Sequence, residues 1–291
     1  MPSEKAACGR IDSPPVTFVL LTGATRGIGQ AAAVEIASQG VEVALVGRDA
    51  GRVSDVASQA RATGGGARVH EHVADLMLMA DVRALADEVR VTYEHIDVLA
   101  NNAGAVFASR KETSEGLEQT FALNHLAPFL LTNLLRDRLA GGHVVTTASG
   151  AHKSGRLDLD DLQAIRSYSA MRVYGTSKLC NILFTRELAK RAPELRANCF
   201  HPGVVRTGFG KNENGLLRVL TTIGGPFLRS PQRGARSLVW LALSPDAAAL
   251  DGAYVYDEKV AEPDAQAQDE TLAEGLWEQS AQLVGLSTAP A

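Results

Sequence analysis

The sequence predicts an α/β fold: one doubly wound parallel sheet of about seven strands, with helices on both faces. Three observations predict it. Short, almost continuous apolar runs alternate regularly with longer helical segments, as expected for parallel strands that are buried on both faces. The first apolar run ends in a glycine-rich turn that leads into a helix. The chain has no internal repeats and no low-complexity tracts, so one large domain accounts for its length.

The elements follow in order along the chain. Each apolar run of four to eight residues that is bounded by turn residues is read as a strand. These strands are expected at residues 16–21, 41–46, 67–73, 96–100, 143–148, 196–200 and 253–256. Helical periodicity places helices at 28–38, 49–62, 80–93, 115–135, 174–191, 231–243 and 269–283. Six strands therefore precede residue 201.

The domain boundaries follow changes in composition. Residues 1–15 are polar with two prolines, which predicts a flexible N-terminus, and residues 287–291 form a tail. Residues 16–286 are one domain of the Rossmann type. Within it, residues 207–230 are rich in glycine with scattered apolar side chains. We expect a substrate lid there, the alternative being a surface excursion with short helices.

Composition excludes several functions. Of 291 residues, 45% are hydrophobic and 21% charged, and the formal net charge of −4 provides no general attraction to nucleic acid or acidic membranes. Three widely spaced cysteines, Cys8, Cys180 and Cys199, form no CxxC pattern. We therefore expect reduced thiols, no metal site and a cytoplasmic location. No apolar run approaches ~20 residues, so we expect no integral membrane segment.

The glycine-rich turn is the candidate phosphate loop. It reads Thr-Gly-Ala-Thr-Arg-Gly-Ile-Gly over residues 22–29 and lies at the first strand–helix junction. Glycines let the backbone approach a pyrophosphate, and the free N–H groups at the helix start favour its charge. The GxxxGxG spacing differs from the common GxGxxG, and a plain tight turn is the alternative. The candidate contacts are Gly23, Thr25, Arg26, Gly27, Ile28 and Gly29.

The end of the second strand indicates which dinucleotide is bound. An acidic residue there hydrogen-bonds the ribose hydroxyls of NAD, whereas arginine accommodates the 2′-phosphate of NADP. Arg48 takes this position, and Arg26 adds a second positive charge nearby. NADP(H) is therefore favoured, while the adjacent Asp49 keeps NAD(H) possible.

Tyr174 and Lys178 form the candidate proton-transfer pair. Positions i and i+4 share one face of a helix, and a nearby cation lowers the pKa of a phenol. The spacing alone is weak evidence, because Tyr168 and Arg172 repeat it nearby.

Five motifs, taken together, resemble the short-chain dehydrogenase/reductase family. They are the glycine-rich loop, Asn-Asn-Ala-Gly at 101–104, Asn124, Ser149, and the Tyr174/Lys178 pair. The order matches from about residue 16 to 205. Two segments are similar to the retinol dehydrogenase and protochlorophyllide reductase branch of this family. They run from Tyr174 to residue 189 and from His201 to Thr207.

The resemblance implies a catalytic role for four residues. Tyr174 would be the general acid in carbonyl reduction and the general base in alcohol oxidation. Lys178 would lower the pKa of Tyr174 and bind the nicotinamide ribose. Ser149 would hydrogen-bond the substrate oxygen, and Asn124 would hold a water that relays protons toward Lys178.

Further cofactor contacts are also implied by the resemblance. They are Asp75, Leu76, Asn102, Ala103, Gly104, Pro202, Gly203, Val205 and Thr207. Taken singly, Asp75 could be a helix N-cap and Pro202-Gly203 a plain turn. His152 and His201 pair with no nucleophile, so we expect only polar contacts from them.

The sequence thus predicts an NADP(H)-dependent oxidoreductase that transfers hydride between nicotinamide and a fairly apolar carbonyl or alcohol substrate. The alternatives are reduction of a carbon–carbon double bond on the same scaffold, and a non-catalytic nucleotide-binding regulatory protein. A methyltransferase with a similar fold would leave Ser149 and the Tyr174/Lys178 pair unexplained. From the family, a homodimer or homotetramer packed through the helices at Glu115 and Tyr174 is also expected.

Overall fold

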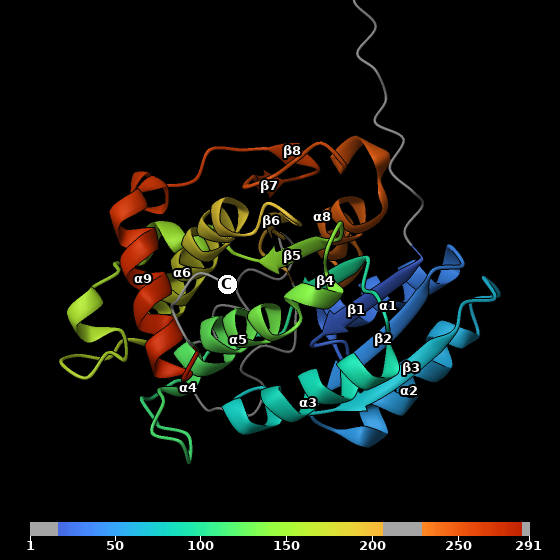
Figure 1. Cartoon of the computed structure of the whole chain (residues 1–291), viewed down its shortest axis with the longest axis horizontal. Coiled ribbons are helices and arrows are strands. Elements are labelled where there is room, and N and C mark those ends of the chain that lie inside the picture. The colour runs from blue at the N-terminus through green and yellow to red at the C-terminus, as the bar shows by residue number, and fades with distance from the viewer. Residues whose placement is uncertain (1–16, 206–228, 287–291) are drawn as a thin grey trace, which may run out of the picture.

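The computed structural model describes residues 17–205 and 229–286, which form one sheet between two layers of helices (Figure 1). The sheet has eight strands in the order β3-β2-β1-β4-β5-β6-β7-β8. All neighbouring strands are parallel except β7 and β8. The predicted doubly wound fold of about seven strands is confirmed.

The strands are short and mostly buried. They are β1 (Phe18–Thr22), β2 (Glu42–Gly47), β3 (Val69–Val73), β4 (Val98–Asn101), β5 (His143–Thr147), β6 (Arg196–His201), β7 (Tyr254–Tyr256) and β8 (Lys259–Val260). Every residue of β1, β4 and β5 is buried. A strand covered on both faces has no polar side, which is why these segments are almost continuously apolar in sequence.

The helices begin and end close to where the periodicity predicts. They are α1 (Gly27–Ser38), α2 (Ala50–Arg61), α3 (Met79–Thr92), α4 (Gln119–Phe121), α5 (Ala127–Leu134), α6 (Ala170–Arg191), α8 (Pro231–Leu243) and α9 (Glu270–Leu283). Side-chain caps define several starts. Asp49 accepts from the backbone N–H of Arg52 at the start of α2, and Ser230 does the same for Arg233 at the start of α8.

Two hydrophobic cores lie on opposite faces of the sheet. One contains the apolar sides of α3, α5, α6 and α9, and the other those of α1, α2 and α8. Figure 1 shows the corresponding two layers. From β3 at one edge, the chain returns to the middle and continues with β4 beside β1. At such a switch point the loops after the two central strands diverge, and a crevice opens at their carboxyl ends.

Helix α9 packs along α6 (Figure 1) and also contacts α5. The Trp277 ring stacks on Phe184 at a centroid distance of 5.9 Å and meets Phe129 edge-on at 4.9 Å. His125 is hydrogen-bonded to the Ser280 hydroxyl at 2.8 Å. Any association of two chains through the helices at Glu115 and Tyr174 must therefore accommodate α9.

The predicted helix over 115–135 is wrong at its start. The structure begins it at Gln119, where the Glu118 carboxylate accepts from the N–H groups of Thr120 and Phe121. Glu115 instead accepts from the N–H groups of Met79 and Ala80, at 2.6 and 2.9 Å, and so caps α3. Both glutamates were read as helix formers, whereas their carboxylates serve as acceptors at helix starts.

Two further differences concern the chain's edges and ends. β8 was not predicted, because two exposed residues carry no strand pattern. The expected flexible segment 1–15, the tail 287–291 and nearly all of the expected lid at 207–230 lie outside the described residues.

Candidate active site

A cavity of about 390 Å³ lies at the carboxyl ends of the central strands. It extends from the glycine-rich loop to the start of the loop after β6. Most of the predicted cofactor residues line it: Gly23, Thr25, Arg26, Gly27, Ile28, Gly29, Arg48, Asp75, Leu76, Asn102, Ala103, Gly104, Tyr174, Lys178 and Pro202. The structure thus brings together residues from Gly23 to Pro202, which are far apart in the sequence.

The glycine-rich loop leaves no room for side chains. A Cβ on Gly29 would lie 2.2 Å from the Gly23 carbonyl oxygen, and one on Gly23 would lie 2.7 Å from Ala103 Cα. Gly23 and Gly27 also have φ of 65° and 57°, a region that favours glycine. The loop's backbone is therefore open to the cavity at the start of α1, the arrangement that suits a pyrophosphate. On this evidence the residues fit a dinucleotide.

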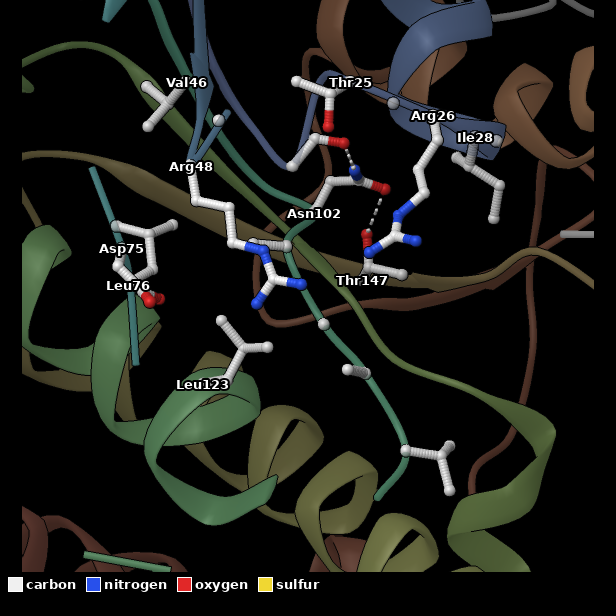
Figure 2. Close-up of a pocket in the computed structure, with 18 of the residues that line it drawn as sticks. Thr25, Arg26, Ile28, Val46, Arg48, Asp75, Leu76, Asn102, Leu123 and Thr147 are labelled. Carbon is white, nitrogen blue, oxygen red and sulfur yellow. Dashed lines mark hydrogen bonds between the residues drawn. The ribbon is translucent and has the colours of Figure 1, made fainter. Parts of the chain in front are cut away.

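Thr22 and Asn102 tie the ends of the central strands together. The Thr22 hydroxyl accepts from the N–H groups of Asn102 and Ala103, at 2.9 and 3.1 Å. The Asn102 amide donates to the Thr22 and Gly23 carbonyls. It also accepts from the Thr147 hydroxyl (Figure 2). Asn102 thus has a structural role besides lining the cavity. The role of Thr22 was missed, although the residue stands in the quoted loop.

Three arginines gather at one end of the cavity. Figure 2 shows the guanidinium groups of Arg26 and Arg48 reaching into the same space, and Arg52 also lines it. Burial first, then repulsion by Arg48 and Arg52, lowers the pKa of Arg26. Within residues 17–205 and 229–286, no carboxylate pairs with Arg26 or Arg48. Clustered cations of this kind suit a polyanionic ligand group.

Asp49 uses its carboxylate for contacts within the protein, whereas NAD binding would require that carboxylate for the ribose hydroxyls. Its carboxylate accepts from the Arg52 N–H at 3.1 Å and pairs with the Arg52 guanidinium at 3.6 Å. The sequence reasoning missed Arg52, although it follows Arg48 by four residues in the first turn of a helix.

Tyr174 and Ser149 meet at the other end of the cavity. Tyr174 is half-buried, and the removal of its hydroxyl from water raises the pKa of the phenol, while a hydrogen bond with the Ser149 side chain lowers it in part. The Ser149 hydroxyl also accepts from the Ala151 N–H at 3.2 Å. We expected Lys178 to lower this pKa, but the net shift is upward and its largest cause is the removal of the hydroxyl from water. The phenol is therefore protonated at neutral pH.

Lys178 is buried beside Tyr174. Its Nζ lies 5.8 Å from the centre of the Tyr174 ring and donates to the Thr147 carbonyl at 2.8 Å. Only 2% of the residue is exposed, and burial lowers the pKa of Lys178 to about 7. Asn181, one helical turn further on, donates to the same carbonyl at 3.1 Å. Asn181 lies within the segment 174–189 that resembles the family, but no role was predicted for it; its i+3 spacing from Lys178 was the available signal.

Asn124 lies next to this pair in a π-helical turn, Ala122–Leu126. Such turns often mark functional positions. Its amide donates to the Ala105 carbonyl and the Ser177 hydroxyl and accepts from the Ala105 N–H, at 3.0, 2.9 and 2.8 Å. A Cβ on Gly104 would lie 3.2 Å from Asn124 Oδ1 and 3.4 Å from Lys178 Nζ. Glycine at 104 thus keeps the space between these two side chains open.

The loop after β6 is only partly placed at the cavity. Pro202 lines it, whereas Gly203, with φ of 80°, and Val205 do not. Val205 forms an isolated bridge with Arg229. Thr207 lies outside the described residues.

Between residues 17 and 205 and between 229 and 286, no group of three or more His, Cys, Asp or Glu side chains could hold a metal ion. Cys180 and Cys199 are buried free thiols. The helices in these same ranges are all too short or too polar to cross a membrane.

The fold and the cavity define a dinucleotide-binding α/β domain in which a half-buried tyrosine lies beside a buried lysine. Comparison with known sequences identifies the family: the model for short chain dehydrogenase matches residues 17–215. The chain therefore belongs to the short-chain dehydrogenase family of oxidoreductases, and the resemblance inferred from its motifs is confirmed.

Relatives with curated names cover nearly the whole chain. A Streptomyces sp. (strain C5) protein, provisionally named daunorubicin C-13 ketoreductase DnrU, is 45% identical over 272 residues, 93% of each chain. Human retinol dehydrogenase 13 is 35% identical over 291 aligned positions, covering 96% of this chain and 88% of that protein. A solved structure from Mycobacterium paratuberculosis, of a protein without assigned function, matches with a TM-score of 0.77 at 30% identity, covering 95% of this chain and 97% of the other.

Proposed function

We propose that this protein is an NADP(H)-dependent oxidoreductase that transfers hydride between the nicotinamide and a carbonyl or alcohol group. The observation that carries the proposal is the contact of the Tyr174 and Ser149 hydroxyls beside a cavity whose other end holds the glycine-rich loop and the arginines. One end suits a dinucleotide and the other suits proton transfer to oxygen, which is the pairing that carbonyl reduction requires.

The chemistry of the protein residues follows from their positions. The bound nicotinamide would supply or accept the hydride. Ser149 would donate a hydrogen bond to the substrate oxygen and stabilise the charge that develops on it. Tyr174, whose pKa lies above the ordinary value of a phenol and which is therefore protonated at neutral pH, would deliver the proton to that oxygen during reduction. In alcohol oxidation the same hydroxyl would have to lose its proton first, so oxidation is favoured by higher pH.

Lys178 and Asn124 would take part in proton transfer, and Lys178 would also bind the cofactor. The Lys178 ammonium would bind the nicotinamide ribose and, with a pKa of about 7, would exchange protons readily at neutral pH. The open space that Gly104 leaves between Asn124 and Lys178 would admit a relaying water.

The arginine cluster supports NADP(H) over NAD(H). Arg26 and Arg48 would bind the 2′-phosphate with charge-assisted hydrogen bonds. Asp49, the residue that could favour NAD(H), has its carboxylate engaged at the start of α2 and with Arg52.

The proposed substrate is a fairly apolar ketone. The Streptomyces relative is named for reduction of a ketone at C-13 of daunorubicin, and Leu123, Val106 and Phe107 give the cavity apolar walls. Product analysis after NADPH oxidation would separate ketone reduction from reduction of a carbon–carbon double bond.

Replacement of Tyr174 tests the mechanism. Tyr174→Phe keeps the ring and removes the proton donor, so we expect reduction of any accepted ketone to fall by about 10²–10⁴-fold while the Kd for NADPH stays nearly constant. Tyr93→Phe is the matched control, because Tyr93 lies far from the cavity and bonds His72. Near-normal turnover by Tyr174→Phe would rule out the proposed mechanism.

A further inference from the structure

His201 joins two loops that the proposed function places on either side of the reacting atoms. It is the last residue of β6, directly before Pro202. Its Nδ1 accepts from the backbone N–H of Gly150 at 2.9 Å and from that of Gly203 at 3.2 Å. Gly150 directly follows Ser149, the proposed hydrogen-bond donor to the substrate oxygen. One ring atom therefore connects the loop that contains Ser149 to the loop that begins at Pro202.

The chain makes room for this ring by having glycine at 150. A Cβ on Gly150 would lie 2.9 Å from His201 Nε2 and 3.1 Å from Cε1. Gly150 does not have positive φ, so backbone conformation does not explain the glycine. Its absent side chain is what lets the imidazole approach the Gly150 N–H.

Tyr256 packs against the imidazole, and two further residues hold Tyr256 in turn. The ring stacks on Tyr256 of β7 at 4.8 Å, with 15° between the planes. The Arg229 guanidinium covers the Tyr256 ring at 4.9 Å and donates to its hydroxyl at 2.7 Å. Arg229 also pairs with the Asp257 carboxylate at 2.8 Å. The ring therefore packs against a residue of β7 that Arg229 and Asp257 hold in place.

The ring is neutral, with its proton on Nε2. An Nδ1 that accepts two N–H groups has no proton of its own. Burial first, then the positive charge of Arg229, lowers the pKa of His201 to about 4. His201 thus works as a fixed acceptor, not as a proton donor, at neutral pH.

We propose that His201 is a positioning residue for hydride transfer: its Nδ1 sets the spacing between Ser149 and the Pro202-Gly203 turn. The inference rests on the proposed function, in which Ser149 meets the substrate oxygen and the turn lies near the nicotinamide. It goes beyond the simple polar contact that the sequence predicts. A displacement of about 1 Å between reacting groups costs on the order of 10²-fold in rate, so loss of this acceptor should lower kcat more than it raises KM.

Two conservative variants distinguish the effect of the acceptor atom from the effect of having a polar side chain at position 201. The Oδ1 atom of Asn can replace Nδ1, because both are bonded to Cγ, whereas Gln extends its acceptor one atom further, toward the position of Nε2. We expect His201→Gln to lower kcat for ketone reduction by about 10–100-fold and His201→Asn to remain within about threefold of the parent enzyme. His72→Gln, a buried histidine of β3 at the other edge of the sheet, is the matched control and should leave kcat unchanged.

The inference also has a test that needs no turnover. In ¹⁵N NMR spectra of the histidine-labelled wild-type protein, Nδ1 of His201 should show the shift of an unprotonated acceptor, and the Gly150 and Gly203 amide signals should move in His201→Gln but little in His201→Asn. A protonated Nδ1, parent-like kcat in His201→Gln, or equal losses in two folded variants would overturn the proposal. Failure of the proposed function would be recognised separately, by an active Tyr174→Phe enzyme with the predicted NMR signals intact.

Discussion

Replacing Lys178 by Met should make the cofactor-free protein more stable while abolishing activity. The ammonium is buried and donates a hydrogen bond to the Thr147 carbonyl. In Lys178→Met that carbonyl keeps its second donor, Asn181, so no buried acceptor is left without a partner. Methionine fills a similar volume without a charge, and the desolvation cost of the ammonium disappears.

The size of the effect follows from the pKa of Lys178. Burial lowers it from 10.5 to about 7, and each pKa unit corresponds to ~1.36 kcal/mol, so at pH 7 the cost to the folded state is on the order of 3–5 kcal/mol. Between pH 7 and pH 10.5 the unfolded chain holds the proton that the folded chain has lost. The stability of the parent enzyme therefore rises with pH in this window, by up to ~1.4 kcal/mol per pH unit from this group.

Urea unfolding at several pH values measures this difference. We expect Lys178→Met to exceed the parent enzyme in unfolding free energy most at pH 6–7, with the advantage shrinking toward pH 9.5. Other titrating groups cancel when the two proteins are compared at the same pH. Lys190→Met is the control, because Lys190 is half exposed and pairs with Glu270. A variant that is less stable at pH 7, or an advantage that does not change with pH, would refute the reasoning.

Three further predictions test other parts of the structure. Arg48→Ala should weaken NADPH binding by about 10–100-fold and leave NADH binding unchanged in fluorescence titrations, with Arg90→Ala as the charge-matched control; equal losses for both cofactors would contradict a 2′-phosphate site. Gly29→Ala should abolish cofactor binding and cost about 1–3 kcal/mol of stability, because its Cβ would lie 2.2 Å from the Gly23 oxygen; a variant that binds normally would show that the loop can move aside. Trp277→Ala should lower the unfolding free energy by about 3–5 kcal/mol, measured by urea titration, and a loss below 1 kcal/mol would mean that α9 contributes little to the core.

The fold was predictable because the spacing of apolar residues along the chain follows which positions of each helix and strand are buried. Helix α8 begins and ends at the predicted residues 231 and 243, since its Ser-Pro start is a cap signal and its buried positions recur with helical spacing. Strands such as β1 and β5, buried along their whole length, have no polar positions to confuse the pattern. These features depend only on neighbours along the chain.

Features that depend on distant partners were not predictable in this way. Glu115 looks like a helix residue, but it accepts N–H groups from α3, 35 and 36 residues earlier. The acceptors of the Asn124 amide lie on Ala105 and Ser177, which no local pattern connects. His201 was recognised only as a polar contact, because its two donors come from separate loops.

The carboxyl end of β5 shows why the site depends on the fold as a whole. The Thr147 carbonyl holds Lys178, and the Thr147 hydroxyl bonds Asn102 on the loop after β4. Two residues later the Ser149 side chain meets Tyr174, and the next N–H binds His201 at the end of β6. This run of four residues therefore contacts the helix of Tyr174 and Lys178, the loop after β4 and the end of β6, and Asn102 in turn connects to the glycine-rich loop. Backbone groups of a buried strand cannot shift singly without losing hydrogen bonds. The end of β5 therefore fixes the proton donor, the lysine and the loop that follows β6 relative to one another.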